Sequence, residues 1–163
     1  MPDDASQAEA ASRWNVLAYG LGQLINGLAD LDFATFAVDD RVVMTITRDA
    51  SDVWILASGP HDEVEPVELS PPQRDILSQA GFSPPLSEAA ERAAQRTSWW
   101  LRLPASGDAS TFDTAGHTMI SALRDVYGAN HPEAVEWQGL ALSDGSRSVL
   151  DALPLTRSPS RPR

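Results

Sequence analysis

The stretch DFATFAVDDRVVMTITRDASDVWILASG, residues 32–59, contains three short segments rich in β-branched and aromatic residues. Apolar and polar side chains alternate most clearly in the second segment, and turn-forming residues at 39–40 and 50–52 separate the three. This pattern predicts strands over 33–38, 41–48 and 52–58 joined by tight turns. We expect this antiparallel unit to form the centre of the domain's sheet.

The residues before this unit have the period of a helix. Large apolar side chains recur every three or four positions, at Trp14, Leu17, Leu21, Leu24 and Leu28. This spacing predicts an amphipathic helix from about residue 9 to residues 28–30. Glycines inside a helix cost about 1 kcal/mol each relative to alanine. Because Gly20 and Gly27 lie seven residues apart on one flank of this helix, we expect another element to pack closely there.

The second half of the chain alternates helices and strands. Ser70, two prolines and Gln73 form a capping box that predicts a helix up to Ala80, and Gly81 is suited to end it. A strand is predicted over 97–103, a long helix over 110–127 and a last strand over 134–142. The order helix, three strands, helix, strand, helix, strand predicts an α+β fold. We expect a mainly antiparallel five-stranded sheet with helices on one face.

The length of 163 residues suits one domain with short tails. We expect residues 1–8 to be disordered, residues 9–142 to form a single α+β domain, and residues 143–163 to be a turn-rich, mostly disordered tail.

Charge and composition exclude several classes of function. The chain has 23 acidic residues against 12 basic ones, all of them arginine, and it has no cysteine. Such an acidic surface repels nucleic-acid phosphates and anionic lipid, so we expect neither partner. The acidic N-terminus lacks the features of a signal peptide, and no apolar run approaches the length of a membrane span. We therefore expect a cytoplasmic protein.

The polar side chains do not suggest catalysis. Asp113 and His117 lie four residues apart on the predicted long helix, but no nucleophile motif accompanies them. The aspartates at 30, 32, 39 and 40 are better explained by turn formation than by metal binding. We expect no enzyme activity, no metal and no cofactor.

The tryptophans are the more informative residues. On the predicted strands, Trp54 and Leu56 face away from Val53 and Ile55, and Trp100 and Arg102 face away from Leu101. If helices cover one sheet face, these side chains lie on the other, where Trp137 is a further candidate. Exposed tryptophan beside arginine is typical of a binding surface. The alternative, left open here, is that residues 59–69 or 86–96 cover this face.

Several segments of the second half together resemble a known family. They are ILSQAGF at residues 76–82, the prolines that follow, Trp99-Trp100, and ALRDVYG at residues 122–128 followed by Pro132. With the first helix and the three strands, residues 10–142 resemble the TY-Chap domains, actinobacterial relatives of type III secretion chaperones and YbjN proteins. The resemblance implies a sheet backed by helices, frequent dimerisation and the binding of peptides or proteins.

The sequence therefore predicts a non-catalytic, chaperone- or adaptor-like module that binds a peptide or protein partner. The candidate binding residues are Trp54, Leu56, Trp100, Arg102 and Trp137. A homodimerising structural or regulatory domain without a peptide ligand is the alternative, and a hydrolase is a third.

Overall fold

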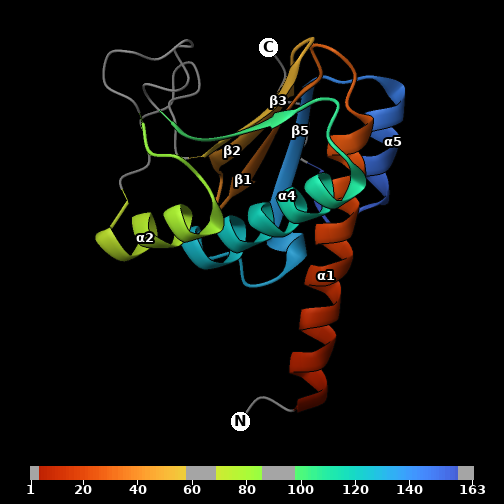
Figure 1. The fold of residues 1–163 in the computed structure, drawn as a ribbon. Coiled ribbons are helices and arrows are strands. Elements are labelled where there is room, and N and C mark those ends of the chain that lie inside the picture. Colours follow the sequence, from red (N-terminus) through yellow and green to blue (C-terminus); the bar gives the residue numbers. More distant parts are fainter. Residues whose placement is uncertain (1–3, 58–68, 86–97, 158–163) are drawn as a thin grey trace.

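The computed structural model describes residues 4–57, 69–85 and 98–157 (Figure 1). In chain order the elements are α1 (Asp4–Gly27), β1 (Phe33–Val38), β2 (Arg41–Arg48), β3 (Asp52–Ala57), α2 (Pro71–Ala80), β4 (Trp99–Pro104), α4 (Ala109–Ser121), a π-helical turn η1 (Ala122–Val126), a 3₁₀ turn η2 (Pro132–Ala134), β5 (Val135–Ala141), α5 (Asp144–Ala152) and β6 (Thr156–Arg157).

The sheet confirms the predicted α+β class. Its described strands follow the order β4-β3-β2-β1-β5-β6, and every neighbouring pair is antiparallel except β5 and β6. Five of these strands were predicted. The sixth, β6, has two residues and makes the sheet mixed rather than purely antiparallel.

The predicted turn at Asp39-Asp40 is a tight hairpin turn. Both residues have positive φ angles, 53° and 63°, as the type I′ turn requires to match the twist of its strands. The register between β1 and β2 then shifts after Phe36, which leaves Val43 without a directly opposed residue. Val43 is nevertheless buried.

The main core lies between one face of the sheet and the helices. Phe36, Met44, Ile46 and Ile55 contribute from the strands. Buried apolar residues of α1, α2, α4 and α5 complete this core, and Figure 1 shows α4 crossing the sheet beside α1. Trp54 and Leu56 are also buried but do not belong to this cluster, because they lie on the opposite face.

Glycines allow α1 to approach its neighbours closely. A Cβ at Gly20 would collide with the Leu153 side chain, which follows α5. A Cβ at Gly22 would lie 3.0 Å from the Phe112 carbonyl oxygen of α4, and one at Gly116 would meet the Ala18 carbonyl. The expected close packing is thus confirmed at Gly20. It is wrong at Gly27, where a Cβ would meet nothing within 4 Å.

Both ends of the chain hold more regular structure than the sequence analysis expected. Helix α1 begins at Asp4, because residues 4–12 are rich in alanine and contain no glycine or proline. Beyond residue 142, the Ser143 side chain accepts a hydrogen bond from the Ser146 backbone and caps helix α5, which β6 follows. Only residues 158–163 of the expected disordered tail lie outside the described residues, and the domain boundaries themselves stay a prediction.

A buried carboxylate fastens α5 to the sheet. Asp32 is 4 % exposed and accepts hydrogen bonds from the Ser143 backbone (2.7 Å), the Ser146 hydroxyl (2.7 Å) and the Ala29 backbone (2.7 Å). Burial acts to raise the pKa of Asp32. The hydrogen bonds from Ser146, Ala29 and Ser143 together outweigh it and hold the pKa below its ordinary value of 3.8. The contacts with Ser143 and Ser146 link residues more than a hundred positions apart.

Candidate functional site

The register of β3 and β4 brings four of the five predicted binding residues together. Trp54 lies opposite Arg102, and Leu56 lies opposite Trp100. Side chains of directly opposed residues share one face of an antiparallel pair. The Trp54 and Trp100 rings lie with their centroids 6.1 Å apart and their planes inclined by 49°. We call Trp54, Leu56, Trp100 and Arg102 the outer cluster.

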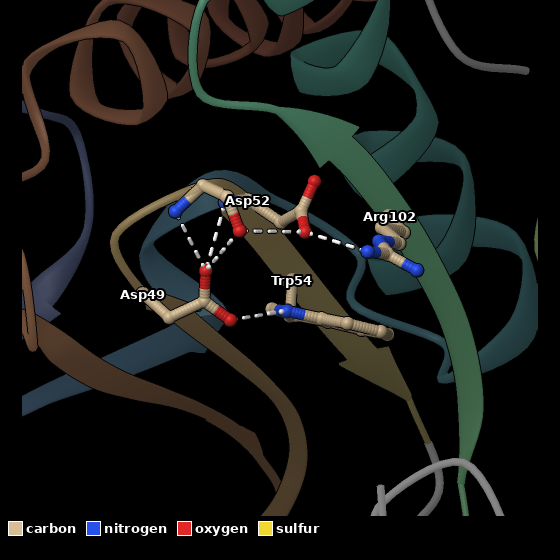
Figure 2. Close-up of polar contacts among 5 residues, drawn as sticks. Asp49, Asp52, Trp54 and Arg102 are labelled. Atoms are coloured by element: carbon tan, nitrogen blue, oxygen red, sulfur yellow. Dashed lines mark hydrogen bonds and ion pairs between the residues drawn. The ribbon is translucent and has the colours of Figure 1, made fainter. Parts of the chain in front are cut away.

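A polar network fixes one side of the outer cluster (Figure 2). One carboxylate oxygen of Asp49 accepts a hydrogen bond from the Trp54 indole N–H (3.1 Å), and the other accepts from the backbone of Ser51 and Asp52. Asp52 forms an ion pair with Arg102, 2.8 Å from Oδ2 to Nη2, and the guanidinium lies 5.1 Å from the centre of the Trp54 ring. Trp54 is thereby held at its ring and at its N–H.

The exposure of the outer cluster differs from the expected apolar patch. Trp54 is 2 % exposed and Leu56 is 9 % exposed, so neither presents its side chain to solvent. Of the two alternatives left open for this face, burial is the one that holds for Trp54 and Leu56, as it does for every residue of β3. Trp100 is half-buried, and the Arg102 side chain is 42 % exposed. Residues 58–68 and 86–97, which hold nearly all of the expected alternative covers, lie outside the described residues.

Trp137 does not join the outer cluster. It lies opposite Phe36 in the pairing of β5 with β1, so its side chain points toward the helices. It is 1 % exposed and belongs to the main core. The strand phase that would place Trp137 beside Trp54 is therefore wrong. The Arg157 guanidinium of β6 lies 5.4 Å from the centre of its ring.

The side chain of Trp100 carries a polar group that has no hydrogen-bond partner among the described residues. This group is the indole nitrogen, which is buried. The backbone of Trp100 is better satisfied, because its N–H and C=O bond with the C=O and N–H of Ser83 at 3.0 and 2.8 Å. A buried donor without an acceptor costs about 1–3 kcal/mol, so an acceptor supplied here would be stabilising.

A cleft that the sequence analysis missed lies on the inner side of β4. It has a volume of about 380 Å³ and is lined by Ala80, Gly81, Leu101, Leu103, Ser110, Thr111, Thr114, Ala115 and Thr118. The strand contributes the leucines, and α4 contributes a row of small residues three or four positions apart. This row of small residues was the sequence signal from which the cleft could have been predicted. Small side chains on one helix face leave room beside a strand that large ones would fill.

The residues weighed for catalysis and metal binding have other surroundings. Asp113 and His117 are both exposed, and His117 lines neither this cleft nor a second one, of about 450 Å³, between α1 and α4. Asp32 is committed to the hydrogen bonds that fasten α5, and Asp39 and Asp40 form the hairpin turn. Across residues 4–57, 69–85 and 98–157, no three acidic or histidine side chains gather as metal ligands would.

The comparisons with known proteins gave one match. The model of a family described as T3SS (YopN, CesT) and YbjN peptide-binding chaperone 3, TY-Chap3, matches residues 7–141. The match runs from α1 to the last residue of β5, and α5 and β6 lie beyond it. No curated protein and no solved structure matches the chain significantly. Within the described ranges, no helix is long and apolar enough to traverse a lipid bilayer.

Proposed function

Because the chain belongs to the TY-Chap3 family of peptide-binding chaperone domains, we propose that it is a non-catalytic module that binds an extended peptide along β4. The observation that carries this proposal is the cleft on the inner side of β4. Strand β4 ends the sheet among the described strands, and the Ser83 bridge is its one described outer neighbour. Extended peptides commonly bind at such an edge and place alternate side chains in a pocket beside it.

The cleft suits one apolar side chain of the peptide. Its volume lies at the low end of the range of about 300–1,000 Å³ for ligand pockets. Leu101 and Leu103 line its strand side and Ala115 lines its helix side, and burial of an apolar group between them would be favourable. Thr114 is exposed at the rim.

The outer cluster would contribute further contacts to the same peptide. Trp100 is half-buried, so part of its side chain could pack against the peptide, whereas its buried indole N–H is out of the peptide's reach. Arg102 stays 42 % exposed while paired with Asp52 and could also meet a peptide carboxylate. Trp54 and Leu56 would act as the buried support of these two residues. Trp137 has no part in this site.

The test uses a phage-displayed library of random twelve-residue peptides, selected against the unmodified chain. The selected peptide is then titrated against Thr114→Phe, which fills the cleft from its rim, and His117→Phe, which adds the same ring one helical turn away. We expect Thr114→Phe to weaken binding about tenfold, equivalent to about 1.4 kcal/mol, and His117→Phe to leave it unchanged. Equal affinities of the two variants would place the peptide elsewhere.

A homodimer is the second candidate, favoured by the exposed face of α1. Val16 is 58 % exposed and Tyr19 is 62 % exposed, three positions apart on that helix. Figure 1 shows the N-terminal half of α1 extending beyond the other described elements. A second copy could cover these side chains. Sedimentation at several concentrations tests this, with Tyr19→Ala expected to weaken any dimer and a monomer at all concentrations removing the candidate.

We also propose that binding takes place in the cytoplasm and involves neither nucleic acid nor membrane. The excess of acidic residues over arginines supports the second part, because it opposes contact with phosphate-bearing surfaces. The cytoplasmic location is supported by the acidic N-terminal sequence, which lacks the features of a signal peptide.

A further inference from the structure

The outer edge of β5 is occupied by a very short strand of the same chain. Strand β6 has only two residues, Thr156 and Arg157, which pair in parallel with Glu136 and Trp137. Both are exposed. Parallel pairing of two residues is a weak attachment by itself, because isolated pairs of short strands are at best marginally stable. Something besides the backbone pairing must select these residues for this edge.

Three contacts of the Thr156 and Arg157 side chains supply that selection. The Arg157 guanidinium lies 5.4 Å from the centre of the buried Trp137 ring and 4.0 Å from the Asp151 carboxylate. The Thr156 hydroxyl donates a hydrogen bond to the Glu133 carbonyl at 2.8 Å. A cation over the face of a tryptophan is worth about 0.5–2 kcal/mol, depending on how far it is desolvated. The outer edge of β5 thus binds an extended backbone segment that carries an arginine.

Charge favours the same class of segment. From Thr156 to the last residue, the sequence contains three arginines and no acid, whereas the rest of the chain holds nine arginines against 23 acids, a net charge of −14. The Asp151 carboxylate lies 4.0 Å from the Arg157 guanidinium of β6. The only acid-free basic stretch at either end of an acidic chain is therefore the one that reaches this edge.

We propose that the outer edge of β5 is a docking strip for a basic, extended segment of a partner protein, and that Thr156 and Arg157 occupy it as an internal ligand. The partner's arginine would replace Arg157 over Trp137. Strands β4 and β6 stand at opposite ends of the described strand order, so this strip is separate from the site along β4. A partner must displace β6, which makes the strip self-inhibited.

The experiment uses a chain ending at Leu155, which keeps α5 and its Asp32 contacts. The probe is the synthetic peptide PLTRSPSRPR, corresponding to residues 154–163, and its control carries glutamate in place of the arginine at 157. Binding is followed by the NMR signal of the Trp137 indole N–H, assigned by its loss in Trp137→Phe. The full chain is titrated in parallel.

We expect the shortened chain to bind the arginine peptide, and the full chain to bind it at least about tenfold more weakly, because a tethered ligand has an effective concentration near the millimolar range. The glutamate peptide should not bind. In the full chain, Arg157→Glu should restore binding of the arginine peptide, whereas Arg161→Glu, with the same charge change in the same segment, should not.

Equal binding by the shortened and full chains would overturn the proposal, as would binding of the glutamate peptide. Self-association of the shortened chain in sedimentation, without peptide binding, would assign the edge to a second copy instead and would also overturn it. Thr114→Phe should leave this binding unchanged, so a failure here is distinguishable from a failure of the site along β4.

Discussion

Two tryptophans near opposite edges of the sheet each carry an arginine over the ring, at 5.1 Å for Trp54 and 5.4 Å for Trp137. The arginine at Trp54 belongs to β4, which pairs with β3 along its whole length, and its carboxylate partner lies 2.8 Å away. The arginine at Trp137 belongs to the two-residue β6, and its carboxylate partner lies 4.0 Å away. The same chemistry thus serves a fixed strand at one edge and a removable strand at the other.

The largest expected effect on the free energy of unfolding is that of Trp54→Ala, which tests whether the Trp54 ring is buried in the folded chain. Trp54→Ala should lower the free energy of unfolding by about 3–5 kcal/mol, the usual cost of removing a fully buried aromatic ring. The exposed Tyr19→Ala should change it by less than about 0.5 kcal/mol. Urea unfolding of both variants makes the measurement. A cost below 1 kcal/mol for Trp54→Ala would mean that this ring is accessible, and the distinction between the two edges would weaken.

The second largest effect is expected for Asp32→Ala, which should destabilise the edge formed by β5 and β6 without affecting the edge formed by β3 and β4. Asp32→Ala removes the acceptor shared by Ser143, Ser146 and Ala29, and it should destabilise the chain by about 2–3 kcal/mol because buried donors are left unpaired. It should also loosen α5 and with it β6. Hydrogen exchange should therefore rise at the backbone amides of β5 and α5 and stay unchanged in β3 and β4. A uniform rise would show that the two edges open together.

The same carboxylate predicts a pH dependence. Because the folded-state pKa of Asp32 lies below its ordinary value of 3.8, its contribution to stability is complete above that value and is lost as the pH falls through the folded-state pKa. Asp32→Asn lacks this contribution at every pH. The difference in urea midpoint between the two chains should therefore be largest near neutral pH and should narrow below about pH 4. A constant difference down to pH 3 would contradict the assignment.

The sequence predicted the region of β3 and β4 better than the region of β5 and the C-terminal segment, because only the first depends mainly on local sequence patterns. Alternation and turn residues placed β3 and β4 correctly, and with them the shared face of Trp54, Leu56, Trp100 and Arg102. Alternation reports which side chains share a face, but not what covers that face. Trp54 is bonded through its indole N–H to Asp49 and lies under the Arg102 guanidinium, and such tertiary contacts leave no periodic signal in the sequence.

The errors at β5 and the C-terminus have a similar origin. The face on which Trp137 lies follows from its register with Phe36 on a strand far away in sequence. Helix α5 is short, and its serine and glycine residues favour turns. It is stabilised largely from outside, by Asp32 at its start and by burial of Leu150 against the core. Local propensity therefore predicted a tail where long-range contacts produce a helix.

A smaller effect measures how tightly each arginine is held. A double-mutant cycle between Arg102→Gln and Asp52→Asn should give a coupling energy of about 1 kcal/mol, since the pair is close and partly buried. The cycle between Arg157→Gln and Asp151→Asn should give about 0–0.3 kcal/mol, because both side chains are about half exposed and 4.0 Å apart. Thermal unfolding supplies the energies, and a reversal of their order would invert the assignment of fixed and removable edges.

The smallest expected effect has the opposite sign. Gly145 lies in the first turn of α5, where a Cβ would meet nothing within 4 Å, so Gly145→Ala should stabilise the chain by about 0.5 kcal/mol. The matched control is Gly128→Ala, whose φ of 78° disfavours any Cβ and should reverse the sign. Because a firmer α5 holds β6 in place more of the time, Gly145→Ala should also slow hydrogen exchange at Trp137. Stabilisation without that slowing would show that α5 and β6 detach independently, and the removable unit would then be β6 alone.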